Sequence, residues 1–220
     1  MKKSFLLILL VLNFVPLFAQ YEATPPSESP EIRTLFGKPT IGKVGFYVGP
    51  EFAYTQFDSK SVYLVGLSGG AIINHNFSIG LSGFGIVNSG NLNYPNIQDS
   101  VSANLYGGYG GLKLEYRLWP SSPINVSFPL LIGSGLLAYS TYNWDTIDDP
   151  DYEYNGDSVI DSDMFFVIEP GVMVGMNVLK FMRVDIGLSY RHTAGLHLVN
   201  TNDHLMNNFS SNVALRFGLF

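Results

Sequence analysis

The chain has 220 residues, of which 12 are Lys or Arg and 18 are Asp or Glu, and its formal net charge is −6. This acidic balance argues against a nucleic-acid partner, which would require a basic surface. The absence of Cys excludes disulfide scaffolds, thiolate metal sites and cysteine nucleophiles. Charged residues make up 14% of the chain, against roughly 25% in an average soluble domain, which is too few to coat a surface that faces water on all sides.

Residues 1–19 have the features of a secretory signal peptide. Lys2 and Lys3 supply the positive charge at the start, residues 5–11 are uninterrupted apolar, and Ala19 precedes a cleavage site before Gln20. The apolar run is too short for a membrane-spanning helix, which needs about 20 such residues. We therefore expect residues 1–19 to be removed during export.

Residues 20–42 are predicted to be a flexible Pro-rich linker. The segment contains four prolines among Ser, Thr and Glu, a composition that cannot bury enough apolar surface to become ordered. The folded domain is accordingly predicted to cover residues 43–220.

Within residues 43–220, apolar and polar residues alternate with a period of two, which is the pattern of β-strands. In the clearest run, Ile186 and Leu188 lie on one face, and Asp185 and Arg191 lie on the other. Eight strands are predicted, at about 43–57, 62–73, 77–87, 104–118, 124–141, 164–178, 182–193 and 209–219. The third and fifth lose their alternation, near Ser82-Gly83 and through 130–137, which predicts a β-bulge or a strand end at each place.

The connections between these strands alternate in length. Three are tight, at 74–76, 119–123 and 179–181, whereas those at 88–102, 142–163 and 194–207 are long and polar; only 58–61 breaks the long series. Short turns at one end and long loops at the other are typical of outer-membrane barrels. The prediction is an all-β fold, an eight-stranded antiparallel up-and-down transmembrane β-barrel.

Composition decides which face of the strands points inward. The polar face is made of Gly, Ser, Asn and a few charged residues, too few for the outside of a soluble barrel. An eight-stranded barrel is just wide enough for side chains to fill it, so these charges are predicted to pair inside, with an ion or proton path as the alternative. The predicted inward charges are Lys43, Glu51, Lys113, Glu115, Arg117, Glu169, Arg183, Asp185, Arg191 and Arg216.

Several segments together resemble the small outer-membrane β-barrel family that includes OmpA-type barrels and PorT-like proteins. The resemblance is carried by segments 18–20, 43–49, 73–81, 114–118 and 187–191 and by the closing run 214–220. It implies a barrel in the cell outer membrane, surrounded by outer-membrane lipids. The closing run resembles the aromatic C-terminal signal read by the barrel-insertion machinery, although Phe217 and Phe220 lie three residues apart, so Phe220 is out of phase with the apolar face.

The third long loop is acidic and contains a possible calcium site. Asp151, Glu153, Asn155 and Asp157 place oxygen ligands at every second position, and Gly156 permits a sharp turn, as at the start of a calcium-binding loop. The bidentate Glu that would close such a loop is missing. A solvated acidic loop is the alternative, and no other cofactor is expected.

The fourth loop and its borders collect His192, His197 and His204 with Asp203, while Ser189 lies nearby in the sequence. Histidine, acid and hydroxyl are the groups of a hydrolase, so one hypothesis is a hydrolase or acyltransferase that acts on envelope lipids from the barrel rim. The His-x-Ser pattern of lipid-trimming barrel enzymes is absent, because Thr193 follows His192.

The prediction for function is a non-enzymatic outer-membrane barrel whose polar loops bind an external or envelope protein partner or support assembly of an envelope or secretion complex. Besides the lipid-modifying enzyme, the remaining alternative is a soluble, lipocalin-like periplasmic carrier of an apolar ligand.

Overall fold

The computed structural model describes residues 43–87, 89–98, 101–141 and 159–220. The predicted signal peptide, the predicted linker and most of the acidic loop lie outside these ranges. Within them, no helix has the length and apolar character needed to cross a membrane.

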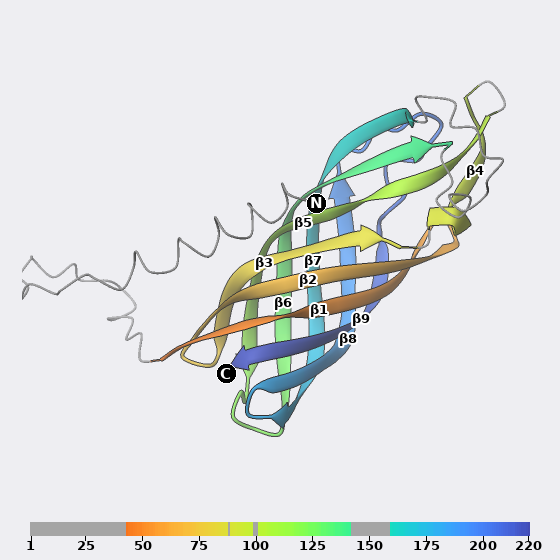
Figure 1. Ribbon diagram of the computed structural model, residues 1–220. Coiled ribbons are helices and arrows are strands. Elements are labelled where there is room, and N and C mark those ends of the chain that lie inside the picture. The colour runs from red at the N-terminus through yellow and green to blue at the C-terminus, as the bar shows by residue number, and fades with distance from the viewer. Residues whose placement is uncertain (1–42, 88, 99–100, 142–158) are drawn as a thin grey trace, which may run out of the picture. The chain divides into compact units, whose positions relative to one another are not determined.

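All eight predicted strands are present (Figure 1). The strands are β1 (Val44–Phe57), β2 (Lys60–Ile73), β3 (Phe77–Ile86), β4 (Asn93–Gln98), β5 (Val101–Leu118), β6 (Ile124–Ser140), β7 (Val159–Leu179), β8 (Met182–Ala194) and β9 (Asn208–Leu219). The short β4 lies inside a predicted loop, and β7 begins earlier than the predicted residue 164.

Each strand of the barrel pairs antiparallel with its neighbours. The pairing of β1 with β9 and the pairing of β3 with β5 close the ring. The sheet order is β3-β2-β1-β9-β8-β7-β6-β5-β4, and β3 also pairs with β5. Because β4 pairs only with β5, it stands outside the ring, and the closed barrel has the eight predicted strands.

The connections lie as the sequence predicts. The tight turns and the start of β1 share one end of the barrel, where the Asn74 amide donates to the Lys43 carbonyl and the Gly218 amide to the Phe181 carbonyl, both at 2.9 Å. We call this the turn end. The opposite end, the loop end, carries the hairpin turn at 58–59, η2 (Ser89–Asn91) with β4, and the loop 195–207.

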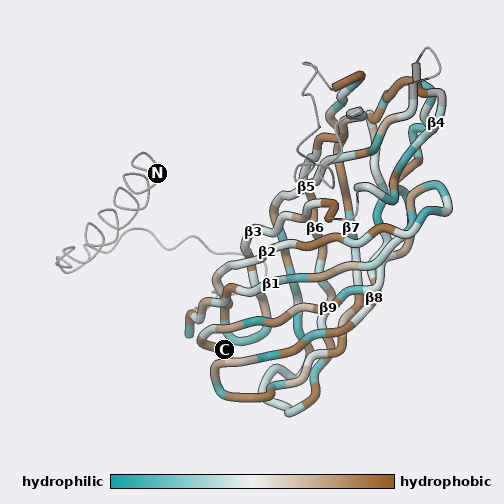
Figure 2. The backbone as a smooth tube through the Cα atoms, turned by 45° about the vertical axis from the view of Figure 1, so that its right-hand side comes forward, coloured by the Kyte–Doolittle hydropathy of each residue, from teal (hydrophilic) through white to brown (hydrophobic). Residues whose placement is uncertain are grey.

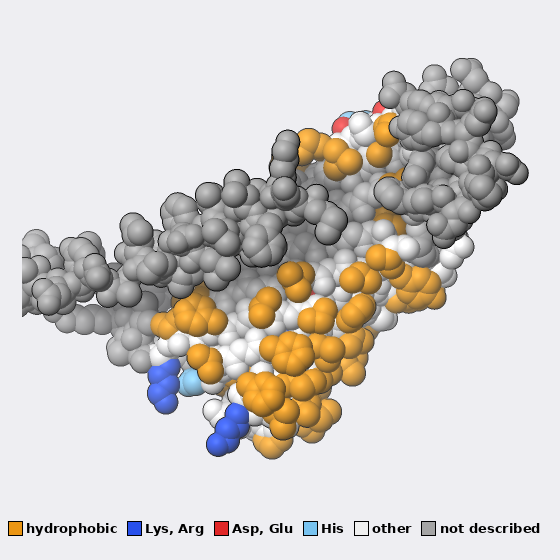
Figure 3. All heavy atoms as spheres, viewed as in Figure 1, with side chains coloured by type: hydrophobic (Ala, Val, Ile, Leu, Met, Phe, Trp, Pro, Cys, Tyr) orange, Lys and Arg blue, Asp and Glu red, His pale blue; other side chains and the backbone are white. Residues whose placement is uncertain are grey.

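The outer wall of the barrel is apolar. Large apolar side chains from every strand of the ring are exposed on it, and Figure 3 shows such side chains gathered on one face of the molecule. Hydrophobic and hydrophilic residues follow one another along the strands (Figure 2). Nine charged side chains within the strands are at least nine-tenths buried: Glu51, Lys113, Glu115, Arg117, Glu169, Arg183, Asp185, Arg191 and Arg216. The polar face therefore points inward, which excludes the soluble-carrier alternative, since that requires the charges outside.

The prediction that Lys43 points into the barrel is wrong. Lys43 precedes β1 and is exposed at the turn end. It contributes nothing to the interior, because the chain has not yet entered the barrel wall at this residue.

Neither predicted loss of alternation is a bulge or a strand end. Strand β3 pairs without interruption through Ser82 and Gly83, and β6 pairs with β5 without interruption through 130–137. The only irregularity of β6 lies with β7, between Tyr139 and Ser140. The alternation is lost in the sequence because these strands turn apolar side chains inward near the loop end, among them Phe84 of β3.

Exposed aromatic side chains lie near both ends of the wall. Tyr54 packs on Tyr63 at 5.5 Å between ring centroids, near the loop end. Trp119 is exposed at the turn end. Aromatic residues at both boundaries are expected of a barrel that spans a bilayer.

Candidate functional site

The interior near the turn end holds a neutral cluster of two acids and two arginines. Glu115 accepts hydrogen bonds from Arg117 Nη2 at 2.6 Å and from Arg216 Nη1 and Nη2 at 2.8 and 2.6 Å. Asp185 lies 2.9 Å from Arg117 Nη1 and 3.0 Å from Arg216 Nε. Because the four groups come from β5, β8 and β9, the cluster ties these strands together across the lumen.

Two further ion pairs lie in the interior. Lys113 binds Glu51, which also accepts from Ser68 Oγ at 2.7 Å. Arg191 Nε lies 3.1 Å from Glu169 Oε2, and the same oxygen accepts from the hydroxyl of Tyr109 at 2.7 Å. The predicted internal pairing is therefore confirmed for eight of the nine buried charges.

Arg183 is the ninth buried charge and has no carboxylate partner among the described residues. Its Nε donates to Asn177 Oδ1 at 2.7 Å, and its guanidinium lies 4.1 Å from the ring centroid of Phe220. The unusual phase of Phe220 thus places its ring against a lumenal arginine, whereas Phe217 lies on the outer wall.

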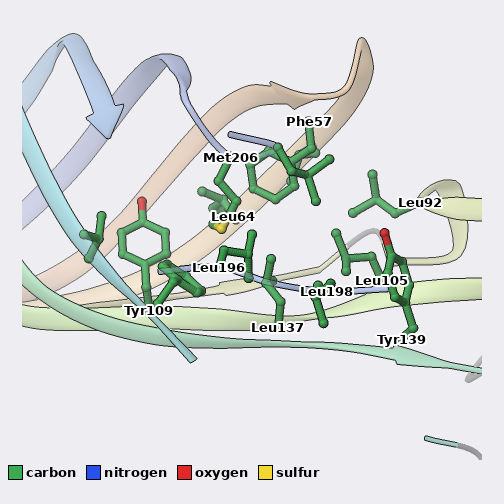
Figure 4. Packing of buried hydrophobic residues seen from close by; sticks show 14 of the residues in the cluster. Phe57, Leu64, Leu92, Leu105, Tyr109, Leu137, Tyr139, Leu196, Leu198 and Met206 are labelled. Atoms are coloured by element: carbon green, nitrogen blue, oxygen red, sulfur yellow. The ribbon is translucent and has the colours of Figure 1, made fainter. Parts of the chain in front are cut away.

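The interior near the loop end is apolar (Figure 4). Inward side chains such as Phe57, Leu64 and Leu137 pack there with Leu196 and Met206 of the loop 195–207. The loop therefore folds back over the lumen and closes it. This plug was not predicted, because the loop is polar on average; the sequence signal for it is the spacing Leu196-x-Leu198 and the pair Leu205-Met206.

A polar pocket of about 270 Å³ lies at the loop end beside this plug. Its lining comes from the turn Asp58-Ser59, Tyr94 of β4, Tyr139 of β6 and residues between 200 and 208. These segments meet because the ring brings the β1–β2 turn, the β8–β9 loop and the end of β6 to the same end of the barrel.

Hydrogen bonds hold the walls of the pocket in place. Asn207 Oδ1 accepts from the amide and the hydroxyl of Thr193 at 2.7 and 2.8 Å. The hydroxyls of Tyr139 and Thr201 are 2.7 Å apart, and Thr201 Oγ1 donates to the Val199 carbonyl at 3.0 Å. Asn200 Nδ2 donates to the Ile97 carbonyl at 2.8 Å, which joins the loop 195–207 to β4. Hydrogen bonds therefore hold the side chains that line the pocket in defined positions.

Tyr94 is the pocket residue with an unmet hydrogen-bonding need. Its hydroxyl is buried and has no partner among the described residues. Its ring lies 4.1 Å from Lys60 Nζ and makes an edge contact with Tyr139 at 5.6 Å between centroids. Burial, together with the neighbouring Tyr139 and Asp58, raises the pKa of the Tyr94 phenol, so the group stays a neutral O–H.

The structure does not assemble the predicted hydrolase group. Ser189 points into the lumen, where its hydroxyl donates to Glu169, while His192 lies exposed on the opposite face of β8. His197 Nδ1 lies 3.6 Å from Asp203 Oδ1, but both side chains are more than half exposed. The grouping fails because a serine and a histidine three residues apart on a strand point to opposite sides.

One contact among the histidines was not predicted. Asn207 Nδ2 lies 3.3 Å from His192 Nδ1 and 3.2 Å from His204 Nδ1, so the amide bridges the two rings. The bridge connects the end of β8 to the pocket wall.

Metal binding at the predicted calcium residues stays a prediction. Asp151, Glu153, Asn155 and Asp157 lie outside the described residues. In the part of the chain that the structure describes, no three His, Asp or Glu side chains gather in a group that could hold a metal ion.

The glycine-rich segment 107–111 of β5 is part of the barrel wall. A Cβ at Gly111 would lie 2.2 Å from the Ile132 carbonyl oxygen of the neighbouring strand, and Gly107 has a φ of 150°. Glycine is therefore required by close strand contact.

Comparisons with known proteins show similarity only to solved structures. No protein-family model matches the chain, and no curated protein matches it. Similar structures include Neisserial surface protein A, NspA, at 12% identity with a TM-score of 0.47, covering 80% of this chain and 96% of that one. The N-terminal β-barrel domain of Pseudomonas aeruginosa OprF is similar at 14% identity with a TM-score of 0.43, covering 79% and 97%.

The outer membrane protein OprG from Pseudomonas aeruginosa is similar at 9% identity with a TM-score of 0.45, covering 80% of this chain and 95% of that one. The names of OprF and OprG describe a β-barrel domain and an outer membrane protein, respectively. At such identities the likeness concerns the fold alone, and the eight-stranded architecture rests on the strand pairing of this chain itself.

Proposed function

We propose that the protein is a non-enzymatic integral protein of the cell outer membrane, that its lumen does not conduct, and that its loop end is a binding surface directed outward. The observation that carries the proposal is the construction of the loop end, where an apolar plug closes the lumen and a polar pocket is held by hydrogen bonds beside it. Loops on a rigid scaffold commonly carry binding function.

Three features support the location and orientation. The predicted signal peptide directs export, the apolar wall requires a lipid surrounding, and long loops face outward in outer-membrane barrels. Outer-membrane lipids would contact the outer wall, and the barrel-insertion machinery would insert the barrel into the membrane. We propose that the remaining loop surface binds an external or envelope protein partner. This binding would include support of an envelope or secretion assembly.

The proposal is tested by labelling single cysteines on intact cells, because the natural chain has none. Asp203→Cys reports on the loop end and Lys180→Cys on the turn end, and both residues are exposed. A membrane-impermeant maleimide should label only the loop-end cysteine until the outer membrane is permeabilised. Labelling of the turn-end cysteine on intact cells, or of neither after permeabilisation, would contradict the proposed topology.

The enzymatic alternative is tested separately. Alanine at His192 and His204 should leave the envelope lipid profile unchanged, since the Nδ1 atoms of both rings contact the Asn207 amide, which is not a nucleophile. A changed lipid profile in this variant would favour the lipid-modifying enzyme.

A further inference from the structure

We propose that the lumen at the turn end contains a binding site for one small monovalent anion of about the size of chloride, and that Arg183 holds this anion. The site lies at the opposite end of the barrel from the proposed binding surface. The inference therefore goes beyond the proposed function and does not depend on it.

Arg183 is fixed in position, but its two terminal nitrogens are left over. The side chain is 4% exposed, and its Nε donates to Asn177 Oδ1 at 2.7 Å. The Nδ2 of Asn177 in turn donates to the carbonyls of Pro120 and Ser122, at 3.0 and 2.7 Å. The Phe220 ring lies against the guanidinium. Nη1 and Nη2 of Arg183 have no hydrogen-bond or ion-pair partner among the described residues, and neither belongs to the fully enclosed polar atoms. Both can therefore reach a ligand.

Arg183 lines a small pocket at the turn end, together with His75 of the tight turn between β2 and β3. The His75 side chain is half-buried and has no partner in the part of the chain that the structure describes. A neutral imidazole carries one N–H in either tautomer, so His75 supplies a second donor. The hydroxyls of Tyr47 and Ser78 in the same lining are fully enclosed and do not contribute.

The charge around this pocket favours an anion over a water molecule. Arg117 and Arg216 are both bound to Glu115 and Asp185, which leaves Arg183 as a net charge of plus one among these five groups. A guanidinium stays charged in proteins, and a buried charge without a counter-charge is costly. Water can accept from the terminal nitrogens, but only an anion also neutralises the charge.

The size of the pocket limits the anion to a single atom. Its volume is about 10 Å³, which is about the space that one water-sized particle needs. Chloride is a little larger than water, and the half-buried His75 side chain can move slightly to admit it. Phosphate, sulfate and organic carboxylates would extend beyond the pocket, so the structure favours a halide.

The direct test is crystallography of the full chain grown in bromide, which replaces chloride and is located by its anomalous scattering. We expect a bromide peak beside the Arg183 guanidinium. The peak should be absent in Arg183→Gln and present in Lys180→Gln, which also removes one positive charge at the turn end but from an exposed side chain.

A second test measures the effect of chloride on stability. The natural chain and both variants are unfolded by urea in zwitterionic phospholipid vesicles, while gluconate is replaced by chloride at constant ionic strength. A ligand that binds only the folded state stabilises it, so the unfolding midpoint of the natural chain should rise saturably with chloride. Lys180→Gln should keep this rise, and Arg183→Gln should lose it.

Four results would overturn the inference. They are the absence of a bromide peak at Arg183 in the natural chain, a peak that persists in Arg183→Gln, a midpoint that does not respond to chloride, and an equal response in the natural chain and Arg183→Gln. Should Arg183→Gln fail to fold, His75→Phe removes the second donor. Half of the stabilisation should then require more chloride than in the natural chain, and an unchanged requirement would count against the site.

Discussion

The substitution Glu115→Gln tests whether the buried ion pairs stabilise the barrel. Glu115 is 3% exposed and receives three charge-assisted hydrogen bonds from Arg117 and Arg216. Glutamine has nearly the same shape, but its amide nitrogen cannot accept a hydrogen bond. The variant therefore loses at least one of the three bonds and leaves two buried arginines facing Asp185 alone.

The expected cost follows from the charge left unpaired. The cluster changes from net neutral to net positive, and Arg183 already adds one positive charge nearby without a carboxylate partner in the described ranges. Breaking a buried ion pair in this way costs about 3–5 kcal/mol. Adding Arg216→Met should restore neutrality, so the double variant should be less destabilised than the sum of the two single variants.

The assay is urea unfolding of the protein in phospholipid vesicles, followed by the fluorescence of its 2 tryptophans. Asp203→Asn is the matched control, because this carboxylate is exposed and 3.6 Å from His197. Its free energy of unfolding should change by less than about 0.5 kcal/mol. Equal and small effects of Glu115→Gln and Asp203→Asn would refute the reasoning.

Four further outcomes are expected. Gly175→Leu should abolish the folded, unboiled gel band, because a Cβ there would lie 2.2 Å from Asp185 Oδ1; a normal band would contradict the packing. Leu196→Asp should expose the loop 195–207 to protease while the barrel fragments stay protected, since Leu196 is fully buried in the plug; an uncut loop would contradict its anchoring role. Purified protein in planar bilayers should show no stepwise conductance, and defined channel openings would contradict a filled lumen. If the predicted acidic loop binds calcium, millimolar calcium should raise the melting temperature, and Asp151→Asn with Asp157→Asn should remove the rise; an unchanged melting temperature in the natural chain would eliminate the calcium site.

The strands and their orientation could be predicted because each wall position obeys the same alternation. Asp185 and Arg191 face the lumen and Ile186 faces outward, as expected from the sequence alone. A barrel of this width buries its inner side chains in any environment. The scarcity of charged residues was therefore the feature that indicated that the polar face points inward.

The plug and the pocket could not be predicted in the same way. Inward leucines near the loop end resemble a loss of alternation, because the lumen there is as apolar as the outside. The pocket combines segments as distant as Asp58 and Asn207, and only the ring closure brings them together. The predicted grouping of Ser189 with His192 does not form for a related reason, because side chains three positions apart on one strand point to opposite sides of the sheet.

The most direct test of the central claim, a closed barrel in the outer membrane with its charges inside, is heat-modifiability. Detergent-extracted envelopes are run on a denaturing gel with and without boiling. We expect the unboiled protein to migrate differently from the boiled form and to be found only with outer membranes, since a closed barrel resists detergent until it is heated. A protein released in soluble form by osmotic shock, with no difference between the two lanes, would contradict the account.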